Sequence, residues 1–199
     1  QLQNDGLLSS KAGSGIFVAD VLGSAFSPAL IRLFERHDAA VTDYIAFRRD
    51  LECLAVERAA AMGSETDLKI VNAIFLKMEI AHEKRDAAIE AKLDAEFHMA
   101  IIEASHNVIM LHMMRSMFDL LQQGVFYNRQ VIFKQRTTRG TLLDQHRAIN
   151  DALQKRDPAA ARMAVSDHLS FVENALYQGQ KADRNEKISR LRLAHINES

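Results

Sequence analysis

The chain has 199 residues, of which 48% are hydrophobic, with 8 glycines, 2 prolines and a formal net charge of -1. This composition excludes an intrinsically disordered chain and favours helices over sheets. The balanced charge gives no overall positive field for nucleic acid, and no stretch approaches the roughly 20 apolar residues of a membrane helix. Because the one cysteine, Cys53, cannot form an internal disulfide, we expect a cytoplasmic protein.

The first twenty residues differ from the rest because glycines interrupt a run with β propensity. Residues 7–10 and residues 15–18 can pair as two short strands around a turn at residues 11–14, where glycine tolerates positive φ. A lone hairpin is barely stable in water. We therefore expect it to be the remnant of a domain whose other elements lie upstream of Gln1.

Helix-start and helix-stop residues divide the remainder into an all-α, antiparallel bundle of about six to seven helices. Expected starts are Ser27-Pro28, Thr42, Ser64 with Asp67, Asp86, Val108, Thr141 and Asp157-Pro158. Expected stops are Arg36, Ala61 followed by Gly63, Asn107, and Phe133 followed by a polar link over residues 134–140.

Three histidines and one aspartate fall on the apolar faces of these helices. Asp94 and His98 are four residues apart, so they point to the same side of one helix. His146 lies in an apolar row of a later helix, and His168 lies in an apolar row of the last one. The four side chains can therefore meet in the core.

An aspartate and three neutral imidazoles are typical ligands of Zn, Ni, Mn or Fe(II). If such a site is octahedral, it leaves positions for water or a bound molecule. The alternative is that each histidine is a core residue whose ring hydrogen-bonds to a neighbour. Spacing alone leaves both interpretations open.

Arg48 is a charged residue on the apolar stripe of its helix. A buried guanidinium needs an anionic partner, because burying an unpaired charge is costly. That partner is either the carboxylate of a bound acid, which arginine grips with two hydrogen bonds, or an ion pair with Glu52 or another acid of the chain.

Two enzyme hypotheses compete with a binding role. Glu79-Ile-Ala-His82 and Glu103-Ala-Ser-His106 match the Glu-x-x-His pattern of di-iron bundles, but such a site needs further inward glutamates, for which only Glu52 and Glu173 are available. A mononuclear metalloenzyme would need an acid or base beside an open metal position, and no nucleophile–base pair is evident. We therefore expect no enzyme.

A series of motifs runs through the helical region. It comprises Phe47-Arg-Arg-Asp-Leu-Glu52, Glu57-Arg-Ala-Ala-Ala61, Asp94-Ala-Glu-Phe-His98, Glu103-Ala-Ser-His-Asn107, His146-Arg-Ala-Ile149 with Leu153, and Arg162 with His168-Leu169. In this order they resemble the ligand-binding FCD domain of GntR-family transcriptional regulators of the FadR type, over roughly residues 25–180. Within that family, residues 107–117, 127–129 and 168–172 look closest to regulators of the pyruvate dehydrogenase complex and of lactate utilisation.

The resemblance implies an effector-binding helical domain over residues 23–180. Its divalent metal ion would be held by Asp94, His98, His146 and His168. The effector would be a small carboxylate, a 2-keto or 2-hydroxy acid such as pyruvate, lactate or glycolate. Arg48 and Asn107 are then the candidate effector-binding residues.

The ends of the chain also fit this resemblance. Residues 1–22 resemble the wing that ends a winged helix-turn-helix domain, whose DNA-reading helices would precede Gln1. Lys11 at the wing tip is a candidate phosphate contact, although one lysine is more often a solvated residue. Residues 181–199 form a basic tail, which we expect to be solvated. The implied partners are operator DNA, a small carboxylate effector and a second copy of the chain in a homodimer.

Overall fold

The computed structural model describes residues 8–11, 15–18, 31–32, 36–37, 39–122 and 136–198. The principal helices are α2 (Ala40–Met62), α3 (Glu65–Lys84), α4 (Ala87–Ala104), α5 (Val108–Gln122), α7 (Arg136–Gln154) and α8 (Pro158–Glu198). The expected helical bundle is therefore confirmed. None of the described helices is long and apolar enough to cross a lipid bilayer.

A two-stranded hairpin precedes the bundle. Strands β1 (Leu8–Lys11) and β2 (Gly15–Val18) pair antiparallel, with Lys11 opposite Gly15. The expected pairing is present, and Lys11, predicted to lie in the turn, belongs to the first strand. That the hairpin is the wing of a DNA-binding domain, and that Lys11 contacts DNA, stay predictions. Most of the helix expected over residues 28–36 lies outside the described residues.

Local capping chemistry explains several of the helix starts. The hydroxyl of Ser64 accepts a hydrogen bond from the backbone of Asp67, whose carboxylate accepts one from the backbone of Ser64. Asp86 accepts from the first turn of α4 in the same way. Pro158 is the first residue of α8, as its fixed φ favours. These starts are confirmed.

Three predicted boundaries are wrong. Helix α2 begins at Ala40 rather than at Thr42, without a side-chain cap. Helix α4 ends at Ala104, and Asn107 instead caps α5 by accepting a hydrogen bond from the backbone of Met110. Helix α7 begins at Arg136, so Gly140 lies inside it. The buried ion pair of the neighbouring Arg139 anchors this first turn and overrides the weak helix propensity of glycine.

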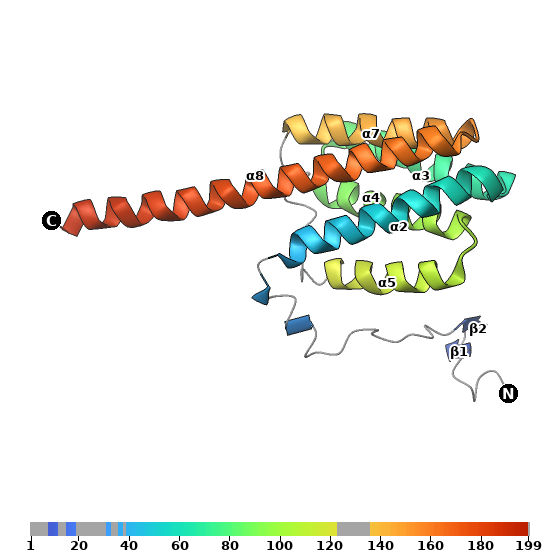
Figure 1. Ribbon diagram of the computed structural model, residues 1–199, viewed down its shortest axis with the longest axis horizontal. Helices are drawn as coiled ribbons and strands as arrows, with labels where there is room; N and C mark the ends of the chain where they lie inside the picture. Colours follow the sequence, from blue (N-terminus) through green and yellow to red (C-terminus); the bar gives the residue numbers. More distant parts are fainter. Residues whose placement is uncertain are drawn as a thin grey trace.

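The helices pack around α2, which runs along α8 and also contacts α4, α7 and α5 (Figure 1). Helix α3 covers α4 and α7. The interior divides into two groups of buried apolar side chains, one containing Phe97 and Ile149 and the other containing Ile102 and Leu142. Helices α2, α4, α7 and α8 carry residues of both groups, whereas α3 contributes only to the first group and α5 only to the second.

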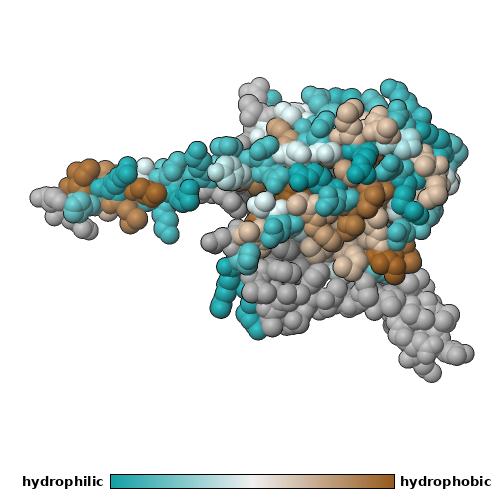
Figure 2. Space-filling view, in the orientation of Figure 1, coloured by the Kyte–Doolittle hydropathy of each residue, from teal (hydrophilic) through white to brown (hydrophobic). Residues whose placement is uncertain are grey.

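Helix α8 continues well beyond the bundle (Figure 1). Its side chains are exposed where they are described between residues 181 and 196, and brown apolar groups alternate there with teal polar ones (Figure 2). The expected basic tail is thus the continuous end of α8 rather than a separate element.

Candidate metal centre

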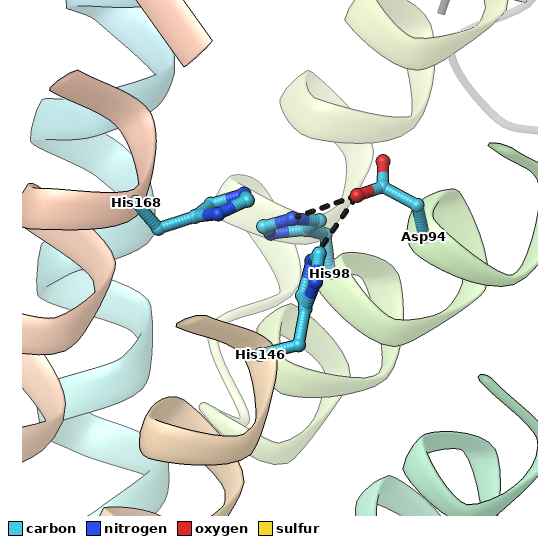
Figure 3. A group of neighbouring side chains, drawn as sticks. All are labelled: Asp94, His98, His146 and His168. Carbon is cyan, nitrogen blue, oxygen red and sulfur yellow. Dashed lines mark ion pairs between the residues drawn. The ribbon is translucent and has the colours of Figure 1, made fainter. Parts of the chain in front are cut away.

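The four candidate ligands come from three helices and meet in the core (Figure 3). Asp94 and His98 lie one turn apart on α4, His146 projects from α7 and His168 from α8. One ligand atom of each side chain lies within 4.8 Å of those of the other three. All four residues are buried, with at most 5% of their surface exposed. The predicted convergence is therefore confirmed as geometry.

Asp94 contacts two of the three histidines (Figure 3). Its Oδ1 atom lies 3.1 Å from Nε2 of His146 and 3.7 Å from Nε2 of His98. The ring of His168 stacks on that of His98, with centroids 5.1 Å apart, and lies 4.5 Å from the ring of His146. The three imidazoles thus share one small volume with a single carboxylate.

Burial and mutual repulsion hold two of the imidazoles neutral. Burial lowers the pKa of His146. Burial, together with the charges of His146 and His98, lowers the pKa of His168 well below its ordinary value. A neutral ring nitrogen has the lone pair that a metal ion requires. These two histidines are therefore in the protonation state of ligands at neutral pH.

His98 differs because carboxylates flank it on both sides. Burial alone would lower its pKa, but Glu52 and Asp94 outweigh this effect and raise it. Nδ1 of His98 lies 2.5 Å from Oε2 of Glu52, so it is the donor in that contact. Nε2, the opposite nitrogen, faces Asp94.

Glu52, which the sequence offered as a possible ion-pair partner of Arg48, also contacts one of the four candidate ligands. Its Oε1 accepts a hydrogen bond from Nε of Arg48 at 2.6 Å, while its Oε2 contacts His98. Burial would raise its pKa, but the charges and hydrogen bonds of Arg48 and His98 lower it to about 2. The carboxylate is therefore ionised. Its position four residues after Arg48 was the available signal.

Gln145 is a second residue that sequence reasoning missed. Its Oε1 lies 3.1 Å from Nδ1 of His168, which makes Nδ1 the protonated nitrogen of that ring. Gln145 adjoins His146, but a neutral amide carries no pattern that would identify it. Glu52 and Gln145 thus hold the Nδ1 atoms of two histidines and leave the Nε2 atoms for other partners.

The buried nitrogens provide a test of whether a cation fits. Nε2 of His98 and Nε2 of His146 are fully buried, yet neither makes a hydrogen bond of acceptable geometry. Buried polar atoms without a partner destabilise a fold. Both atoms face Oδ1 of Asp94 (Figure 3). A divalent cation among these atoms would satisfy both nitrogens and neutralise the carboxylate, so the donor set fits a metal ion.

Of the two candidate effector-binding residues, only Arg48 is connected to this group. It is 1% exposed, and its guanidinium lies 5.1 Å from the centroid of the Phe118 ring. Its ion pair with Glu52 confirms one of the two partners that the sequence left open. The side chain of Asn107 caps α5 and lies outside the group. Effector binding by either residue stays a prediction.

The two Glu-x-x-His motifs lie at the surface and do not converge. Glu79 pairs with Arg147, and the side chain of Glu103 is 49% exposed beside Arg115. The side chain of His106 is 57% exposed and pairs with Asp67. These positions exclude a di-iron centre built from the two motifs.

A second buried ion pair lies one turn before Asp94. Arg139 donates to both carboxylate oxygens of Glu90 and to the backbone carbonyl of His82. Together with His146 these residues line a pocket of about 10 Å³, which is room for about one water molecule. The pair joins α4 to α7.

Residues 43–171 match the FCD domain family. A protein of Escherichia coli K12 described as an L-lactate dehydrogenase operon regulatory protein is 30% identical over 200 residues, which cover 98% of this chain and 76% of that protein. The Glc operon transcriptional activator of the same strain is 29% identical over 88% of this chain and 70% of its own. The regulator LutR of Bacillus subtilis is 26% identical, covering 86% and 78%. These relatives are regulators rather than enzymes.

Solved structures share the fold at lower identity. The GntR protein of Streptococcus agalactiae superposes with a TM-score of 0.61 at 22% identity, covering 87% of this chain and 77% of its own. The E. coli protein McbR/YncC superposes with a TM-score of 0.62 at 18% identity, covering 89% and 80%. At these identities the likeness shows the fold alone.

Proposed function

Because this chain belongs to the FCD-domain family of GntR-type transcriptional regulators, we propose that it is a metal-dependent sensor of a small organic acid. Regulators of this family bind operator DNA and small-molecule effectors. The observation that carries the proposal is the buried group in which two imidazole nitrogens face Asp94 without a hydrogen bond. A binding site placed in the core of a regulator is suited to sensing.

In this proposal Asp94, His98, His146 and His168 hold one divalent ion, which is Zn, Ni, Mn or Fe(II). Imidazole and carboxylate suit each of these metals. Four protein ligands would leave a six-coordinate ion two further positions, which a carboxylate oxygen and a neighbouring 2-oxygen of an acid could take. This is the chemical reason to favour 2-keto and 2-hydroxy acids such as pyruvate, lactate or glycolate.

Two further observations support a small acid. The name of one relative places it at an L-lactate dehydrogenase operon, and lactate is a 2-hydroxy acid. Arg48 is buried and joined to His98 through Glu52, which places its guanidinium beside the site. We propose that its guanidinium also binds the carboxylate of the effector, since a guanidinium offers five donors to oxygen ligands.

Binding would be transmitted through the helices that carry the ligands. Asp94 and His98 belong to α4, whereas His146 and His168 belong to α7 and α8. An acid that tightens this site favours one arrangement of α7 and α8 against α4. In a homodimer on a palindromic operator, that shift would alter the spacing of the paired DNA-binding domains.

Calorimetry tests the proposal on native protein, metal-stripped protein and the Arg48→Ala variant. Pyruvate, lactate and glycolate are compared with propionate, a control acid that lacks the 2-oxygen. We expect one metal per chain by elemental analysis and binding of the 2-oxygenated acids that metal removal abolishes. Tight binding that survives both metal removal and Arg48→Ala would refute the mechanism. Binding only of long-chain acyl compounds would refute the ligand class.

The homodimer is tested separately. Analytical ultracentrifugation should give about twice the 22.4 kDa of the chain. The full regulator should shift a palindromic operator more strongly than an isolated half-site, since each protomer reads one half. A monomer at micromolar concentration would count against the palindrome.

A further inference from the structure

We infer that Glu52 is a positioning residue of the metal centre, which fixes the ring of His98 so that Nε2 faces the other ligands. The inference rests on the proposed metal site and assigns a residue of α2, which contributes none of the four ligands, to its support. It also assigns the Arg48–Glu52 ion pair a role that needs no effector.

The contacts form one continuous chain across two helices. Nε of Arg48 lies 2.6 Å from Oε1 of Glu52, and Oε2 of Glu52 lies 2.5 Å from Nδ1 of His98. The side chains of these three residues are at most 3% exposed. Water is therefore kept away from these hydrogen bonds, which it would otherwise weaken or replace.

The chemistry of imidazole explains what the carboxylate does. A ring that donates from Nδ1 to a carboxylate keeps its proton there and presents Nε2 as a lone pair. The same contact fixes the rotation of the ring and makes the lone pair of Nε2 a stronger ligand for a cation. Arg48 in turn fixes Glu52 by occupying its other oxygen. Gln145, an uncharged amide, holds His168 in the same way but without the charge.

The test compares two glutamates of the same chain. Glu52→Gln keeps the volume of the side chain and removes its charge beside His98. Glu90→Gln makes the same change in a glutamate that is similarly buried, but whose ion pairs are with Arg139 and His82 rather than with one of the four ligands. Glu90→Gln therefore measures what the loss of a buried ion pair does by itself.

Cobalt(II) titration of the metal-stripped full chain provides the first readout. We expect Glu52→Gln to weaken Co(II) binding by about 10- to 100-fold and to change its visible absorption spectrum. Glu90→Gln should keep the affinity and spectrum of the original protein, even if its melting temperature falls. Equal affinities for the original protein and Glu52→Gln, or equal weakening by both substitutions, would overturn the inference.

Two further measurements separate the outcomes. Nitrogen-15 NMR of the metal-free protein, recorded at a pH above the pKa of His98 so that the ring is neutral, should show its proton at Nδ1 in the original chain and redistributed between the two nitrogens in Glu52→Gln, a readout that needs no metal. If Glu52→Gln does not fold, the Arg48→Met/Glu52→Gln variant leaves no uncompensated buried charge and should show the same loss of Co(II) affinity. Absence of Co(II) binding by the original protein would refute the proposed function, whereas binding unaffected by Glu52→Gln would refute only the role of Glu52.

Discussion

Removing the metal should lower the thermal stability of the protein, because the ion would tie α4, α7 and α8 together. A ligand that binds only the folded state stabilises it by RT ln(1 + [L]/Kd), which is about 2.7 kcal/mol at a free concentration 100 times Kd. For a chain of roughly 200 residues, 1 kcal/mol corresponds to about 2–4 °C in melting temperature. Chelation is therefore expected to lower the melting temperature by about 5–11 °C.

The assay is thermal unfolding followed by circular dichroism, with and without a chelator and then with metal restored. His146→Ala and His168→Ala each remove one ligand. Both variants should therefore lose bound metal, and adding metal should no longer raise their melting temperature. His106→Asn is the control, because His106 is exposed, lies outside the site and has a positive φ of 51°, which asparagine tolerates. Unchanged metal content and metal-dependent stability in both alanine variants would refute the assignment.

Two other perturbations test the surroundings of the site. Phe97→Ala should destabilise the fold by about 3–5 kcal/mol, measured by urea unfolding, because Phe97 is fully buried against the rings of Phe75 and His146. Asp67→Asn should lower the melting temperature at neutral pH but not in strong acid. The check is a series of melting temperatures measured against pH, in which the difference between the variant and the original protein should disappear at low pH. The hydrogen bond from Ser64, opposed by partial burial and aided by the contact with His106, lowers the pKa of Asp67 in the folded state. Its stabilisation is therefore present above the unfolded pKa and is lost as pH falls through the lower folded pKa.

Helical periodicity was sufficient to place the four candidate ligands. Asp94 and His98 share a face because four residues exceed one helical turn only slightly, and His146 and His168 occupy positions that apolar neighbours mark as inward. Such rows depend only on local geometry. The four predicted side chains lie together for that reason, even though the start of α7 was predicted five residues too late. A wrongly predicted helix end does not change the face of the helix on which its central residues lie.

The supporting residues could not be predicted in the same way. Whether Glu52 serves Arg48 alone or also His98 depends on how α2 crosses α4, which no spacing within one helix determines. Gln145 lies beside a predicted ligand, but its contact with His168 requires the packing of α7 against α8. The start of α7 at Arg136 depends on a similar long-range contact, the ion pair between Arg139 and Glu90. Contacts between helices, rather than periodicity, decide each case.

The Arg48–Glu52 ion pair permits a stability prediction that does not depend on any ligand. Removing one partner leaves the other charge buried, so Arg48→Met and Glu52→Gln should each destabilise the fold by roughly 3–5 kcal/mol. The double variant removes both charges at similar volume and should be destabilised by clearly less than the sum of the two single changes. Urea unfolding of the four proteins in the metal-free state gives the coupling free energy. Additive effects would show that the 2.6 Å contact contributes no coupling, and Arg48 would then retain only the role of an effector ligand.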